Sequence, residues 1–247
     1  MSRRPPTLVS CPAVSTIHLL PTAPLAERVL LPGDPGRALL LAQSLLAEPK
    51  MFNHNRGLWG YTGSARDGRS LTIQSTGMGG PSAAIVIAEL AELGARTLLR
   101  VGTCGALDAS LALGDLLVAS EALAADGTSR ALGAGARVAA DPELLARLRD
   151  AAGPGGAHGA IVSSDLFYDS PDGAEEAWRV QGALAVEMET ATLFALARRR
   201  GLRAGCALIV SDTLLPSRRR IDTDALHDAE RRLGELALTA LSDETTR

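Results

Sequence analysis

Short apolar segments alternate with longer amphipathic segments along most of this chain, and Gly or Pro separates many of them. Residues 28–31, 97–101, 115–119, 160–162 and 207–210 are apolar runs of the kind found in buried strands. Helical patterns occupy residues 36–46, 81–93, 142–152, 186–200 and 223–241. Strands that alternate with helices form a largely parallel sheet with helices on both faces. We therefore predict a three-layer α/β/α fold around a mixed, mostly parallel central sheet.

Local signals set the limits of several predicted elements. Residues 66–68 (Arg-Asp-Gly) form a turn signal between two predicted strands. Pro81 and Pro142 stand where helices are expected to begin, and the missing N–H of proline costs little in a first turn. Residues 130–140 are rich in Gly and Ala, which predicts a surface loop or a weak strand.

Length and composition predict one large domain. The chain has 247 residues, of which 46% are hydrophobic, enough for one substantial core but few for two. Residues 1–24 contain many prolines and predict a flexible lead-in, so the domain is expected over residues 25–247. No apolar run approaches the length of a membrane span, and no apolar segment typical of a signal peptide follows Arg3 and Arg4.

The net charge and the cysteines indicate which binding partners and which cellular compartment to expect. A formal net charge of −3 gives no reason to expect binding to nucleic acid or membranes. Lys50 is the only lysine, so nearly all positive charge is guanidinium, which suits bidentate contacts with oxyanions. Cys11, Cys104 and Cys206 show no zinc-type spacing and are odd in number, so we expect a cytoplasmic protein without a disulfide framework.

Three junctions combine glycine with a nearby arginine. Gly33 precedes Arg37, Arg100 precedes residues 102–105 (Gly-Thr-Cys-Gly), and Arg56 precedes Gly57. Glycine lets backbone N–H groups approach an anion, and arginine adds charge-assisted hydrogen bonds. Each junction could equally be a turn beside a surface arginine. A dinucleotide fingerprint at Gly77 is a poor match, because Ser82 holds the third glycine position.

Two acidic positions also suggest chemistry. Glu187 and Glu189 flank Met188 at the expected start of a helix, where one carboxylate would simply balance the helix dipole. A carboxylate can also accept hydrogen bonds from two sugar hydroxyls, and methionine can pack on a sugar or a base. Asp212 directly follows a predicted buried strand, which makes it either a candidate acid or the cap of a turn. No histidine or third carboxylate accompanies these residues, so we expect no metal.

Taken in order, these segments resemble the nucleoside phosphorylase superfamily, in its branch of hexameric purine nucleoside and uridine phosphorylases. The resemblance extends over residues 17–241, nearly the whole chain. It is carried by residues 31–35 (Leu-Pro-Gly-Asp-Pro) with Arg37, and by residues 56–57, 75–82, 100–105, 164–168, 186–189 and 211–212. Each motif alone is weak evidence, whereas all of them in one order are highly specific.

The resemblance implies a role for each matching residue. Arg100 and Asp212 are the implied catalytic residues. The phosphate contacts are implied at Gly33, Arg37, Arg56, Arg100 and Thr103. The ribose contacts are implied at His18, Glu187, Met188 and Glu189. The base contacts are implied at Cys104, Gly105, Phe167, Val186, Ser211 and Asp212.

The resemblance also implies an assembly and a set of substrates. Arg56 and His18 match residues that reach the site of a neighbouring subunit, so a homohexamer, a trimer of dimers, is expected. The substrates are a nucleoside and inorganic phosphate, and no organic cofactor is required. Asp212 can donate to N7 of a departing purine only when it is protonated. An arginine assists this Asp in many relatives, but the sequence does not decide among Arg218, Arg219 and Arg220.

The sequence favours purine nucleosides for salvage but leaves alternatives open. The segment after Tyr168 lacks the Gln-x-Arg with which uridine phosphorylases bind uracil, and Thr213 follows Asp212 where those enzymes have Asn-Arg. Residues 75–100 are nevertheless somewhat closer to the uridine branch. A hydrolytic nucleosidase and a non-catalytic binding relative are further alternatives. The former would lack residues 32–35 with Arg37, and the latter would have lost some of the site residues.

Overall fold

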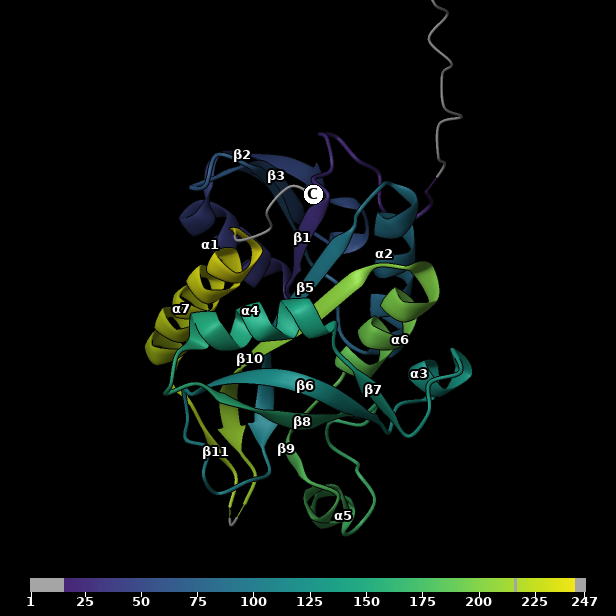
Figure 1. The fold of residues 1–247 in the computed structure, drawn as a ribbon, viewed down its shortest axis with the longest axis vertical. Helices are drawn as coiled ribbons and strands as arrows, with labels where there is room; N and C mark the ends of the chain where they lie inside the picture. Colours follow the sequence, from purple (N-terminus) through teal and green to yellow (C-terminus); the bar gives the residue numbers. More distant parts are fainter. Residues whose placement is uncertain (1–15, 216, 243–247) are drawn as a thin grey trace, which may run out of the picture.

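The computed structural model describes residues 16–215 and 217–242, which form one mixed sheet and helices on both sides of it (Figure 1). The strands are β1 (Arg28–Leu31), β2 (Leu46–Asn53), β3 (Gly60–Ala65), β4 (Ser70–Gln74), β5 (Thr97–Ala106), β6 (Leu116–Ala124), β7 (Arg137–Ala139), β8 (Ala157–Ser163), β9 (Ala183–Glu187), β10 (Arg203–Thr213) and β11 (Arg219–Arg220). The helices are α1 (Pro35–Leu45), η1 (Asn55–Gly57), α2 (Gly80–Glu92), α3 (Gly127–Ala131), α4 (Pro142–Ala152), α5 (Ala174–Val180), α6 (Thr190–Arg200) and α7 (Thr223–Ser242).

The sheet runs in the order β11-β10-β6-β8-β9-β5-β1-β4-β3-β2, with β7 beside β6. Parallel pairs join β4, β1, β5 and β10, and also β6, β8 and β9, while antiparallel pairs join the remaining neighbours. β10 also pairs with β5 along ten residues of each strand, so β5, β10, β6, β8 and β9 form a closed ring. The predicted α/β class with a mixed sheet is confirmed, and the closed ring is a feature that the sequence did not indicate.

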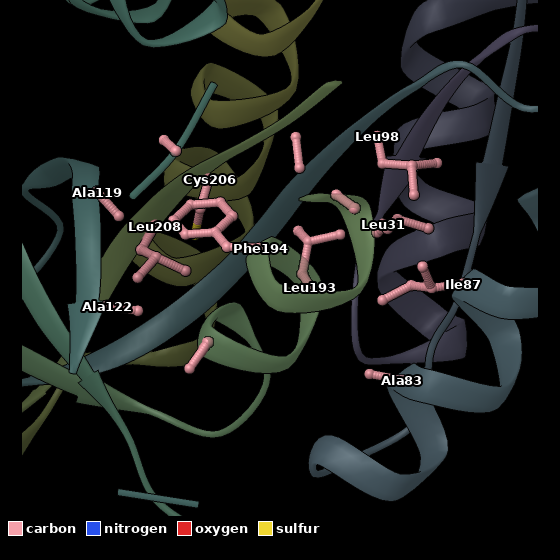
Figure 2. Packing of buried hydrophobic residues seen from close by; sticks show 14 of the residues in the cluster. Leu31, Ala83, Ile87, Leu98, Ala119, Ala122, Leu193, Phe194, Cys206 and Leu208 are labelled. Carbon is pink, nitrogen blue, oxygen red and sulfur yellow. The ribbon is translucent and has the colours of Figure 1, made fainter. Parts of the chain in front are cut away.

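Two cores lie on opposite faces of the central strands. Val29 and Leu31 of β1 belong to one core and Leu30 belongs to the other, as expected when neighbouring strand residues point to opposite faces. The helices α2 and α6 cover the first face, where Phe194 of α6 lies beside Leu208 of β10 (Figure 2). The helices α1, α4 and α7 cover the second face (Figure 1). Burial on both faces explains why these strands are continuous apolar runs.

Most local signals are confirmed, and one is wrong. α4 begins at Pro142 behind the cap Asp141, whose side chain accepts a hydrogen bond from the N–H of Leu144 at 2.9 Å. The helix expected over residues 186–200 begins only at Thr190, because Val186 and Glu187 belong to β9 and pair with β5 and β8. Sheet pairing therefore overrides the helical pattern of these residues.

The segment 16–24, expected to belong to a flexible lead-in, is bonded to the rest of the protein. Leu19 is fully buried, and its N–H donates to Glu89 at 2.6 Å. Leu20 donates to the side chain of Asn53 at 2.9 Å, and Thr22 donates to the carbonyl of Phe52 at 2.8 Å. The predicted lead-in is therefore too long at its carboxyl end, and residues 1–15 lie outside the described residues. Over residues 16–215 and 217–242, no helix has the length and apolar character needed to cross a membrane.

Candidate active site

A cavity of about 510 Å³ lies beyond the carboxyl ends of β1, β5, β9 and β10. Ligands of α/β proteins bind in this position because several strand ends deliver their loops there. Most of the residues expected in the site line this one cavity. They are Gly33, Arg37, Arg100, Thr103, Cys104, Gly105, Phe167, Val186, Glu187, Met188, Glu189, Ser211 and Asp212.

Arg100 is the buried cation of the cavity. Its Nε atom donates to Glu187 at 2.8 Å, and its Nη2 atom lies 2.5 Å from Glu189. Its Nη1 atom is buried and has no hydrogen-bond partner among the described residues. Burial alone would lower the pKa of Arg100, but the charges of Glu189 and Glu187 raise it above its usual range. The cavity therefore contains a permanently charged guanidinium with one donor atom to spare.

Gly102 makes room for this guanidinium, and Gly33 lies beside it. A Cβ atom at Gly102 would lie 2.9 Å from the Cζ atom of Arg100, so any side chain there would displace it. A Cβ atom at Gly33 would lie 4.0 Å from Nη1 and 3.2 Å from the carbonyl of Gly77. The two junctions identified in the sequence thus meet at one guanidinium.

Glu187 positions Arg100 and the beginning of α6. Its carboxylate accepts hydrogen bonds from the N–H groups of Glu189 at 2.9 Å and Thr190 at 3.0 Å, and from the hydroxyl of Ser163. With the bond from Arg100, its two oxygens accept from four protein groups. Glu187 is thus a positioning residue in this structure, and its expected contact with ribose stays a prediction.

Glu189 lies between Arg100 and the glycine-rich turn before α2. Its Oε1 atom accepts from the N–H of Gly79 at 2.5 Å, and its Oε2 atom contacts Arg100. Burial raises the pKa of Glu189, although the charge of Arg100 opposes this. The carboxylate is held rigidly at the cavity wall, where it can accept hydrogen bonds from sugar hydroxyls.

Asp212 lines the cavity next to an arginine that also contacts an aromatic ring. The register of β10 shifts between Val210 and Asp212. Ser211 donates to Oδ2 of Asp212 at 2.9 Å, and Nε of Arg218 lies 3.3 Å from Oδ1. The Cζ atom of Arg218 also lies 4.7 Å from the ring centre of Phe167, within cation–π range. Of the three arginines in this segment, Arg218 is therefore the one whose side chain is ion-paired with Asp212 among the described residues.

Arg37 and Cys104 also line the cavity, the first as a fixed cation and the second as a neutral thiol. Nε of Arg37 lies 2.6 Å from Glu230 of α7, which fixes the guanidinium at the cavity wall. Burial raises the pKa of Cys104, so this side chain is a neutral thiol that offers apolar surface. Among the described residues, no group of three or more His, Cys, Asp or Glu side chains could hold a metal ion.

His18 and Arg56 lie outside this cavity, close to each other on the surface. Nδ1 of His18 lies 2.7 Å from Glu89, and the carbonyl of His18 accepts from Asn55 at 3.0 Å. Arg56 follows Asn55 in η1, is exposed, and has a left-handed backbone with φ of 58°. Such strain in a residue other than glycine is concentrated at functional sites. The two residues predicted to serve a neighbouring subunit therefore share one face of the protein.

The cavity also contains residues that the sequence did not indicate. Glu175 and Trp178 of α5 line it, as does Leu214, and Arg220, which the sequence indicated only as a candidate partner of Asp212, lines it too. α5 has only seven residues, too few for a periodic pattern to be recognised. Arg220 lies opposite Asp212 in the short pairing of β11 with β10, which no local pattern predicts.

Comparison with known proteins identifies the family. The family model described as "Phosphorylase superfamily" matches residues 27–242. A protein of Jannaschia sp. named "Purine nucleoside phosphorylase DeoD-type" is 43% identical over 208 residues, 81% of this chain and 88% of the relative. The "Guanosine phosphorylase" of Halorubrum lacusprofundi is 42% identical over 193 residues, 76% and 79% of the two chains. A DeoD-type relative from Geobacillus kaustophilus is 40% identical over 201 residues, 78% and 84% of the two chains. The chain belongs to the phosphorylase superfamily.

Proposed function

We propose that this protein is a purine nucleoside phosphorylase, which converts a purine nucleoside and phosphate into the free base and α-D-ribose 1-phosphate. The observation that carries the proposal is the buried Nη1 donor of Arg100, which has no partner among the described residues. A buried charged donor without a partner is costly, and a bound oxyanion would satisfy it. Gly33, Arg37 and Thr103 line the same cavity.

The proposed mechanism follows from where charge develops. Breaking the glycosidic bond gives the ribose positive character and the base negative character. Phosphate held by Arg100 and Arg37 would stabilise the cationic sugar and attack its anomeric carbon, while Glu189 accepts from the ribose hydroxyls. A proton from Asp212 to N7 would neutralise the departing purine. Arg218, 3.3 Å from Asp212, would stabilise the carboxylate that forms.

The alternatives make different demands on this cavity. A hydrolytic nucleosidase needs no anion site, so the buried donor of Arg100 favours phosphorolysis over hydrolysis. A uridine phosphorylase needs groups that pair with the uracil edge, and residues 169–173 lack the Gln-x-Arg expected for this purpose. A non-catalytic relative has no need of Asp212 beside Ser211 and Arg218.

Release of base from a panel of nucleosides tests the proposal directly. We expect inosine and guanosine to release their bases only when phosphate is present, adenosine to do so as well, and uridine to react slowly or not at all. Chromatography of base and ribose 1-phosphate, with and without phosphate, measures this. Equal release without phosphate would indicate a nucleosidase, and no release at all would indicate a binding protein.

We also propose that each active site takes His18 and Arg56 from a neighbouring subunit, within a trimer of dimers. Both residues lie on one face, away from the cavity of their own subunit. Purine salvage in the cytoplasm, by a single domain that needs no organic cofactor or metal, completes the proposal. Two buried free cysteines, Cys104 and Cys206, are compatible with a reducing compartment.

Complementation between two inactive variants tests the shared site. Arg56→Ala and Arg100→Ala should each lower activity strongly. Co-expression with two different tags, followed by tandem purification, gives mixed oligomers. In these, some sites combine intact Arg100 with intact Arg56 of the neighbour, so we expect activity well above that of either parent. Mixed oligomers no more active than their parents would mean that Arg56 does not act across an interface.

A further inference from the structure

The helix α5 presents two neighbouring carboxylates with different surroundings. Glu175 lines the cavity, and its side chain forms no hydrogen bond or ion pair with another residue in the described ranges 16–215 and 217–242. Glu176 is exposed, and Arg179 donates to it at 2.8 Å through Nε and 2.6 Å through Nη2. Helix-dipole stabilisation explains an acidic residue at either position in the first turn, but it does not explain why Glu175 borders the cavity.

Glu175 shares the cavity with Phe167 and Asp212, two of the residues expected to contact the base. Trp178, three residues further along α5, lines the same cavity and therefore lies on the same face of the helix. Arg220 lines the cavity too, on the strand that pairs with Asp212. Figure 1 shows α5 next to β9, and β11 on the far side of the same strand ends. A base bound here would meet an acceptor on α5 and a donor on β11.

This arrangement matches the edge of one class of purine. A 6-oxopurine carries N1–H beside the acceptor O6, and guanine adds a 2-amino group. Two adjacent donors can both bind one carboxylate, and O6 can accept from a guanidinium. Adenine has an unprotonated N1 instead, which repels a carboxylate. A site built to pair with donors of the substrate discriminates strongly against an analogue that lacks them.

We propose that Glu175 accepts hydrogen bonds from N1–H and the 2-amino group of 6-oxopurines, which makes guanosine the preferred substrate, inosine the second and adenosine the poorest. Arg220 is the matching donor toward O6. This inference rests on the proposed phosphorolysis of purine nucleosides and adds the specificity of the same site. Glu175 is therefore a specificity-determining residue and takes no part in bond cleavage.

The test compares Glu175→Gln with the matched control Glu176→Gln, which changes the neighbouring carboxylate on the outer face of the same helix. Initial rates with guanosine, inosine and adenosine are measured at saturating phosphate. For Glu175→Gln we expect kcat/KM to fall roughly 10- to 100-fold for guanosine, mainly through KM, since charge-assisted hydrogen bonds are lost. The loss should be smaller for inosine, and adenosine should keep or exceed its wild-type value. Glu176→Gln should leave kcat/KM unchanged for all three nucleosides.

The outcomes separate this inference from the proposed function. Equal changes for all three nucleosides in Glu175→Gln, or the same change of ratio in Glu176→Gln, would overturn the role of Glu175 while phosphorolysis stands. A wild type that prefers adenosine would overturn it as well. A wild type that releases no purine with phosphate would instead overturn the proposed function. Melting temperatures of the two variants show whether α5 keeps its stability.

Discussion

Replacement of Arg100 by alanine should nearly abolish use of phosphate and also weaken the fold. The cavity loses the buried Nη1 donor, which has no hydrogen-bond partner among the described residues and is therefore available to an anion. Each charge-assisted bond contributes about 1.5–3 kcal/mol, so kcat/KM for phosphate should fall on the order of a hundredfold or more. Glu187 and Glu189 would also lose their cation inside the protein. Breaking such a buried pair costs about 3–5 kcal/mol of stability.

Two further variants separate the loss of binding from the loss of fold. Arg100→Lys keeps the charge near both carboxylates but cannot form the fork of the guanidinium, so it should fold and still need much more phosphate. Arg96→Ala removes an exposed arginine just before the same strand and should leave the KM for phosphate unchanged. Initial rates against phosphate concentration, with thermal unfolding of each variant, give the answer. An unchanged KM for phosphate in both Arg100 variants would remove Arg100 from the anion site.

The sequence predicts the part of the fold that depends on local chemistry. Buried strands such as β1 are recognisable because burial on both faces leaves no room for polar residues. Helix starts at Pro142 and Pro81 are recognisable because the first turn tolerates proline. The glycine junctions of Gly33 and Gly102 were identifiable for the same reason, since a close approach of chain to ligand or side chain demands glycine.

The parts of the fold and of the site that the sequence does not predict depend on contacts between residues that are distant in the sequence. The helical pattern over residues 186–200 includes the last two residues of β9, because the pairing of β9 with β5 and β8 leaves no mark on the local sequence. Arg37 meets Glu230 across 193 positions, and His18 meets Glu89 across 71. Glu175 reaches the cavity from α5, which contacts β9. Tertiary packing alone brings these side chains to the site.

Asp212→Asn should lower the turnover of adenosine much more than that of inosine. General acid catalysis contributes about 100- to 10,000-fold, and the amide can still donate to N7 but has no proton to transfer. The leaving adenine anion has no keto oxygen to share its charge, so it depends most on that proton. Hypoxanthine can place charge on O6, which lessens the need. We therefore expect kcat for adenosine to fall at least tenfold more than kcat for inosine.

A variant of Arg218 tests the second part of this mechanism, the stabilisation of the Asp212 carboxylate after proton transfer. Arg218→Ala removes the guanidinium 3.3 Å from Asp212 but leaves the proton in place. If Arg218 stabilises the carboxylate formed by proton transfer, kcat of this variant should also fall more for adenosine than for inosine. Both losses should be smaller than those of Asp212→Asn. Asp228→Asn, at an exposed position on α7 paired with Arg231, is the control and should match the wild type. Equal losses for adenosine and inosine in Asp212→Asn would leave Asp212 as an orienting residue, because only proton donation distinguishes the two leaving groups.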